Sequence, residues 1–146
     1  MVWSRRALLA ALAMSALGAL GSPMAWAVAS IKIRDLYARG AEFSEAALAL
    51  AGQEVEIRGF MAPPLKPDAS FFVLTKMPMA VCPFCDSELN WPLDIVLVRL
   101  ARPQDWVDFN QPIKVRGRLE LGTEVDPETG FVSRVRLVAA GYDLVG

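Results

Sequence analysis

The sequence predicts a small, mainly β protein: a five-stranded barrel that follows a helical segment and a cleavable signal peptide. After Gly52 the spacing of apolar residues changes from a helical period to alternation with period two, which is typical of half-buried strands. Five strand-like runs follow, and two of them carry a glycine at equivalent places. We therefore expect a signal peptide over residues 1–27, a helical lead-in over 28–51 and a β domain over 52–146.

The N-terminus has the three parts of a secretory signal peptide. Arg5 and Arg6 supply positive charge, residues 7–20 are apolar apart from Ser15, and residues 25–27 form a small-x-small cleavage site. Because a membrane span needs about 20 apolar residues, no stable span is expected after cleavage; an uncleaved anchor is the alternative. The arginine pair also resembles a twin-arginine signal, and both export routes stay open. The mature protein is expected to be periplasmic or secreted, where disulfides form.

Charge argues against a nucleic-acid partner. The signal carries two of the 15 Lys and Arg residues and none of the 16 Asp and Glu residues, so the mature chain has three more acids than bases. Nucleic-acid binding normally requires a basic excess or a basic stripe. The mature length is that of one domain, which can bury a modest core.

The segment before Gly52 is predicted to be helical. Ile33, Leu36 and Tyr37 fall on one helical face, and Ser44 is placed to cap the N-terminus of a second helical turn. These residues are good helix formers with an apolar side, so the segment is expected to cover the sheet.

The strand-like runs have apolar residues at alternate positions or in short continuous stretches. They cover residues 54–61, 71–74, 95–98, 113–121 and 134–137. In the last run, Arg134 and Arg136 are expected on the outer face, opposite Val135 and Leu137. Residues 126–130 have turn chemistry.

Two of the runs, residues 55–61 and 113–119, match in residue type. Each places a glycine in mid-strand, Gly59 in the first and Gly117 in the second, where a strand is expected to bend or bulge. Long strands bent by glycine allow a few strands to coil into a small closed barrel. The match between the two segments therefore predicts an OB-like barrel. Two similar strands of an ordinary antiparallel sheet are the alternative.

Four patterns carry a resemblance to a known group. They are Gly-x-x-Val-x-Ile-x-Gly from Gly52, Phe-x-Leu from Phe72, Ile-Val-Leu-Val from Ile95 and Pro-Ile-x-Val-x-Gly-x-Leu from Pro112. Over about residues 52–145 the chain resembles uncharacterised secreted bacterial OB-fold domains of the tRNA-anticodon-like group. The resemblance implies the fold, with a cysteine-containing loop between the second and third strands. It implies little about function, because one fold hosts many activities.

Cys82 and Cys85 are the only cysteines, and their Cys-x-x-Cys spacing lies between the second and third strand-like runs. The chain contains no histidine, which excludes Ser-His and Cys-His catalysis within one chain and zinc enzymes with histidine ligands. We therefore expect the protein not to be an enzyme.

A soft metal ion is one expected occupant of this loop. A structural zinc needs four ligands, so Asp86 or Glu88, or the cysteine pair of a second copy in a homodimer, would complete the site. Copper(I) accepts thioether ligands, which makes Met77 and Met79 candidate helpers. Each methionine taken alone is better explained as core filling under the barrel.

Two other interpretations of the cysteine pair stay open. A permanent local disulfide would make the protein a structural adaptor of an envelope complex, with an envelope protein as its partner. A cysteine pair that alternates between the dithiol and the disulfide would make it a thiol-disulfide redox protein. The sequence Cys-Pro-Phe-Cys resembles the glutaredoxin motif. However, only residues 86–91 separate Cys85 from Pro92, too few for the long helix that activates a glutaredoxin thiolate. Four aromatic residues could line a ligand pocket, although barrel plugs and loop anchors are commoner roles for such residues: Phe84, Trp91, Trp106 and Phe109.

Overall fold

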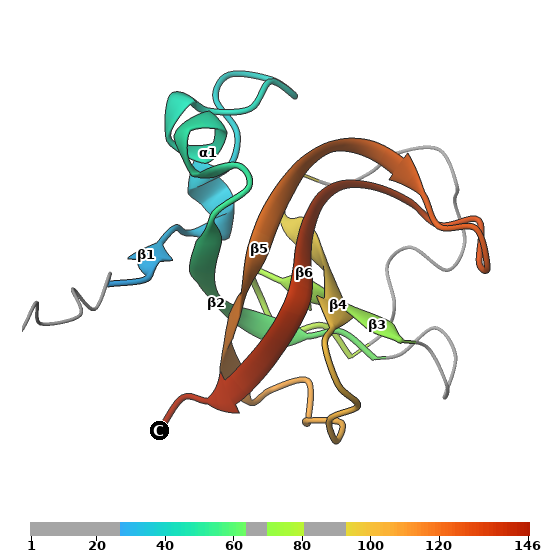
Figure 1. The fold of residues 1–146 in the computed structure, drawn as a ribbon. Helices are drawn as coiled ribbons and strands as arrows, with labels where there is room; N and C mark the ends of the chain where they lie inside the picture. The colour runs from blue at the N-terminus through green and yellow to red at the C-terminus, as the bar shows by residue number, and fades with distance from the viewer. Residues whose placement is uncertain (1–26, 64–69, 81–92) are drawn as a thin grey trace, which may run out of the picture.

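The computed structural model describes residues 27–63, 70–80 and 93–146 of the chain. Within these ranges the protein is mainly β, with six strands in one sheet and little helix (Figure 1). The elements in chain order are β1 (Ala29–Ser30), the 3-10 helix η1 (Ile33–Asp35), α1 (Glu45–Leu50), β2 (Glu54–Met61), β3 (Phe71–Thr75), β4 (Ile95–Leu100), β5 (Pro112–Val125) and β6 (Val132–Leu144).

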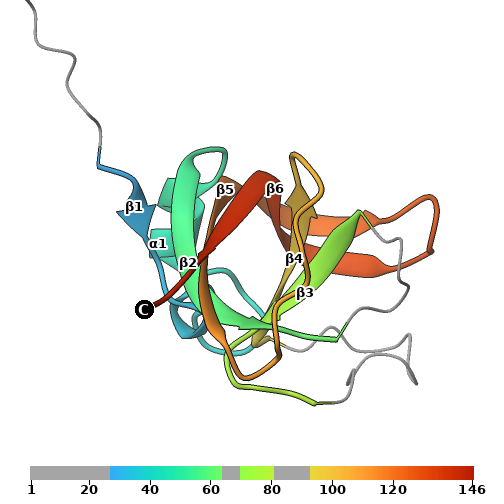
Figure 2. The ribbon, with the colours of Figure 1, turned by 90° about the horizontal axis from the view of Figure 1, so that it is seen from below.

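The strands pair in the order β1-β2-β3-β4-β6-β5, and β2 pairs with β5 as well. The hydrogen-bonded order that starts at β2 therefore returns to β2. β4 runs parallel to β6 and β1 runs parallel to β2, whereas the other pairs are antiparallel. The long strands β5 and β6 curve together across the molecule, with β3 and β4 beside them (Figure 2). Mutual pairing of this kind leaves little unsatisfied strand edge.

The lead-in is less helical than the sequence indicates. Ser44 is the N-cap of α1, as predicted, and its Oγ accepts a hydrogen bond from the Ala47 N–H at 3.0 Å. Before it, the chain forms only the single turn η1 and then a bridge between Tyr37 and Phe43, whose rings stack with centroids 5.4 Å apart. Gly40, with φ of +70°, allows the turn between them. The backbone hydrogen bonds of a longer helix are therefore replaced by a tight turn.

The two matched segments of the sequence pair with each other in the fold. Gly59 lies opposite Ile113, and Gly117 lies opposite Val55, in the antiparallel pairing of β2 with β5. The glycine of each segment thus faces the first apolar residue of the other. The two matched segments therefore form a local two-fold arrangement in the pairing of β2 with β5.

Both glycines are required by close approach of neighbouring backbone. A Cβ on Gly59 would lie 2.5 Å from the Thr75 carbonyl oxygen and 2.9 Å from the side chain of Leu74. A Cβ on Gly117 would lie 2.8 Å from the Ala140 Cβ. These separations are below van der Waals contact, so glycine lets β3 cross β2 and lets β6 cross β5.

A bulge in β6 lies beside Gly117. The register of β5 with β6 shifts between Arg116 and Arg118, and Ala139 has φ of 51°, which non-glycine residues rarely adopt. Just beyond it, the Ala101 N–H donates to the carbonyl of Ala140 at 2.9 Å. The bulge bends β6 where the connection that follows β4 crosses it.

Strands β3 and β4 are buried on both faces, as their continuous apolar runs predict. One face joins the main core with β2, β5 and β6. The other joins a second cluster, against which Phe131 packs from the β5–β6 turn. The second cluster contains Ala62, Phe71, Val73, Ile95 and Leu97.

Arg136 departs from the predicted outer face, because its side chain is only 5% exposed. It lies against Glu120 at 3.5 Å and Glu124 at 3.3 Å, and it donates to the Gly122 carbonyl at 2.8 Å. Arg99 completes this cluster through Glu124 at 2.6 Å. Burial of the guanidinium is tolerated because carboxylates and carbonyls surround it.

Gly59→Ala is expected to lower the free energy of unfolding by about 2–3 kcal/mol, because the new methyl group must displace the backbone of β3. Denaturant unfolding of the mature protein measures it. The exposed neighbour Arg58→Ala is the control and should change stability by less than about 0.5 kcal/mol. Equal stability of the two variants would contradict the close approach.

The ion cluster of Arg99, Glu124 and Arg136 is expected to make the free energy of unfolding depend on pH. This free energy should fall as the pH drops below about 4.5. The hydrogen bond from Arg99, together with the charge of Arg136, lowers the pKa of Glu124 below its ordinary value of 4.5 despite some desolvation. As the pH falls, Glu124 therefore binds a proton in the unfolded chain before it does so in the folded chain. The contribution of its ion pairs to stability is lost as the pH falls through the folded-state pKa of Glu124. Thermal melts between about pH 6 and 3 should show a shallower decline for Glu124→Gln. Glu128→Gln, on the turn that follows β5 and in no ion pair of the described residues, should keep the wild-type slope.

Candidate functional site

The β3–β4 hairpin holds together the two ends of the segment that carries the cysteines. Thr75 pairs with Ile95, and the Lys76 N–H donates to the Asp94 carbonyl at 3.3 Å. The chain therefore leaves and re-enters the sheet at adjacent points. A connection tethered in this way has a fixed base.

The two candidate methionines lie at the start of this connection. Met77 is 61% exposed, and its carbonyl lies 2.7 Å from the Thr75 hydroxyl, which also lies 3.2 Å from the Phe60 carbonyl. Met79 is half-buried. Core filling does not explain Met77, because most of the residue is exposed.

The remaining predicted site residues, Cys82, Cys85, Asp86 and Glu88, lie outside the described residues. Within residues 27–63, 70–80 and 93–146, no three Cys, His, Asp or Glu side chains gather to hold a metal ion. Their arrangement around a metal ion or in a disulfide therefore stays a prediction.

A hollow of about 300 Å³ lies at the base of the connection. Lys76, Leu93 and Asp94 line it from the hairpin, and Arg34 and Tyr37 line it from the lead-in. The lead-in thus lies beside the base of the β3–β4 hairpin, and both cationic and acidic groups border the hollow.

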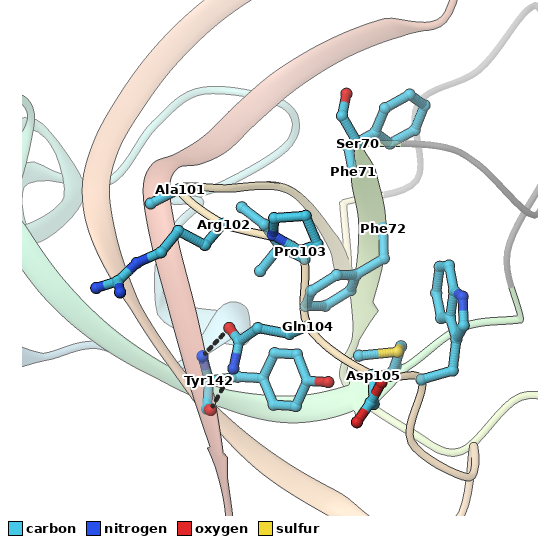
Figure 3. A pocket seen from close by; sticks show the side chains of 12 residues that line it. Ser70, Phe71, Phe72, Ala101, Arg102, Pro103, Gln104, Asp105 and Tyr142 are labelled. Carbon is cyan, nitrogen blue, oxygen red and sulfur yellow. Dashed lines mark hydrogen bonds between the residues drawn. The ribbon is translucent and has the colours of Figure 1, made fainter.

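A second cavity, of about 410 Å³, lies beyond the end of β4 (Figure 3). It is enclosed by the connection from residue 101 onward, the start of β3 and the end of β6. Its wall is largely apolar or aromatic, with one carboxylate. Besides the carboxylate of Asp105, the guanidinium of Arg102 also lines it. The apolar and aromatic lining residues include Met61, Phe72, Leu100, Trp106 and Tyr142.

Gln104 fixes the connection to β6. Its amide nitrogen donates to the Tyr142 carbonyl at 3.2 Å, and its amide oxygen accepts from the Tyr142 N–H at 3.1 Å (Figure 3). One side chain therefore satisfies both backbone groups of a strand residue just past the bulge. This clamp holds the following residues, Asp105 and Trp106, at the cavity.

Tyr142 forms the floor of the cavity. Its ring meets that of Phe72 edge to face at 5.8 Å, and its hydroxyl points toward Asp105 (Figure 3). Burial raises the pKa of Tyr142 above its ordinary value of 10.0, and the negative charge of Asp105 raises it further.

Sequence reasoning found only part of this cavity. Of the four aromatic candidates, Trp106 lines the cavity, with 44% of its surface exposed, whereas Phe109 does not line it. Phe84 and Trp91 lie outside the described residues. Gln104, Asp105 and Tyr142 were missed, because their stretches carry no recognisable motif. The clamp joins residues that are 38 positions apart, which no local pattern indicates.

The fold and the two sites define a mainly β protein with a single sheet, a tethered cysteine-bearing connection and a ligand-sized cavity. No family model matches the chain, and no curated protein matches it. Among solved structures, the chain is similar to a DUF3299 family protein from Pseudomonas aeruginosa PAO1, with a TM-score of 0.52 and 16% sequence identity, over 82% of this chain and 97% of that chain. At this identity the likeness shows the fold alone.

None of the helices in the described ranges has the length and apolar character needed to cross a bilayer. The α-helix α1 has six residues.

Asp105→Asn is expected to lower the pKa of Tyr142 toward 10, because the variant removes the negative charge but keeps the side-chain shape. The pKa should stay above 10, since burial persists. Absorbance titration of tyrosine, with Tyr142→Phe to assign the signal, measures the shift. Asp108→Asn on the same connection should leave the titration unchanged; an equal effect of both variants would contradict the placement of Asp105.

Proposed function

We propose that the protein is an exported, periplasmic binding or accessory module, not an enzyme, that presents Cys82 and Cys85 on the β3–β4 connection for a soft metal ion. The observation that carries the proposal is the tethered hairpin base with the exposed thioether of Met77 beside it. Zinc and copper(I) both accept thiolates, and copper(I) also accepts thioethers.

A local disulfide is the oxidised alternative for the same pair. Disulfides persist in the oxidising periplasm, and closing so short a loop stabilises the fold only modestly. A pair that stays oxidised would make the protein an adaptor of an envelope complex, and a pair that cycles would make it a redox protein. The exposed Met77 favours the metal ion, because neither alternative uses a thioether.

We propose further that the sheet is a five-stranded OB-like barrel of β2 to β6. Support comes from the pairing order, which returns from β5 to β2, and from the parallel pairing of β4 with β6. The matched glycines, Gly59 and Gly117, supply the close strand crossings that such a barrel needs.

Export by a signal peptide is part of the same proposal. Cleavage after Ala27 would leave β1 at the start of the mature chain, where Ala29 pairs with Val55. The mass of the mature protein recovered from a periplasmic extract tests the cleavage site, and residues 1–26 lie outside the described ranges.

Reduced, purified mature protein is expected to hold one ion of zinc or copper per monomer or per dimer, because two thiolates at this spacing bind one ion. Elemental analysis together with thiol counting measures it. Cys82→Ala should lose the ion, and Met77→Ala should weaken copper(I) binding more than zinc binding, because thioethers are soft ligands.

Met61→Leu is the matched control, since Met61 is only 2% exposed in the core and should not affect metal content. Protein without metal and with a disulfide that resists reduction would support the adaptor instead. A reduction potential near those of exchange proteins would support a redox role.

A further inference from the structure

We propose that the cavity between the residue 101–106 connection and β6 binds a small organic cation, an amine with an apolar or aromatic body. The residues that carry this inference are not part of the cysteine-bearing connection, so it does not depend on the proposed function. Four observations carry the inference: the size of the cavity, its aromatic wall, its unneutralised carboxylate and the clamp that holds its shape.

The cavity has the size of a small-molecule site. Its volume of about 410 Å³ falls within the range of about 300–1,000 Å³ that is usual for ligand pockets. Met61, Leu100 and Phe72 give it an apolar interior that a hydrocarbon body can fill. Such a body would gain free energy by leaving water.

Aromatic rings border the space. Tyr142 and Phe72 pack edge to face, and Trp106 lines the cavity while remaining 44% exposed. Tryptophan and tyrosine faces attract cations through the ring quadrupole, and the attraction strengthens when water is excluded. An ammonium group near these rings would be favoured over a neutral group of the same shape.

Two charged side chains, Asp105 and Arg102, line the cavity, and both are exposed. Asp105 lines it and makes neither an ion pair nor a side-chain hydrogen bond within the part of the chain that the structure describes. Arg102 also lines it, but its exposed guanidinium extends away from Tyr142 and Asp105 (Figure 3). A ligand cation would therefore pair with a carboxylate that has no internal partner, whereas an anion would be repelled.

The site is held in place without a ligand. Gln104 uses its whole amide on the backbone of Tyr142, so Asp105 and Trp106 start from a fixed position on the connection. Little ordering is then required when a ligand binds, which favours affinity.

The test uses the mature protein and three matched probes: benzylammonium, neutral benzyl alcohol and anionic benzoate. Tryptophan fluorescence and NMR line shifts follow saturable binding, and Trp106→Phe assigns the fluorescence change. Benzylammonium should bind at least about fivefold tighter than benzyl alcohol, and benzoate should bind more weakly than both. The preference for benzylammonium should shrink in about 1 M salt, where charges are screened within about 3 Å.

Asp105→Asn should abolish the preference for benzylammonium and leave benzyl alcohol binding unchanged. Asp108→Asn, with the same change of charge on the same connection, should keep the preference. Cys82→Ala should keep it too, so that this site and the metal proposal fail independently. Equal binding of benzylammonium and benzyl alcohol by the wild type, a preference that survives Asp105→Asn, or no saturable binding of any probe would overturn the proposal.

Discussion

The close crossing of β2 with its neighbours is the constraint on which the rest of the structure depends. β2 pairs with β5 from Glu54 to Phe60, and its last residues, Phe60 and Met61, also pair with β3. Gly59 makes this possible because any side chain there would meet the Thr75 carbonyl at 2.5 Å. The crossing returns the strand order to β2 and encloses one main core, so both candidate sites are positioned by it.

The same crossing places the cysteine-bearing connection. Thr75, whose carbonyl excludes a side chain at position 59, also ends β3 and pairs with Ile95. The next residue, Lys76, bonds to Asp94 and closes the hairpin base. A residue that fixes the packing of two strands thus fixes the point from which the connection leaves the sheet.

The second glycine has a similar consequence at the other end of the fold. Gly117 accommodates Ala140, and the bulge beside it turns β6 toward the connection that follows β4. Gln104 then bonds both backbone groups of Tyr142 and holds Asp105 at the cavity. The backbone shape that Gly117 allows thus decides where Asp105 and the ring of Tyr142 lie at the cavity.

The sequence by itself determined the mainly β class, the five long strands, the cap at Ser44 and the importance of the two glycines, because period-two alternation and capping are local properties. It did not determine the burial of Arg136, whose partners come from the other strand of a long hairpin, or the short turn that replaces the predicted helix of the lead-in. It also missed the cavity at Tyr142, since this cavity exists only where a bulge, a clamp and a distant strand come together. Such features depend on contacts between residues far apart in the chain, and only the tertiary structure decides them.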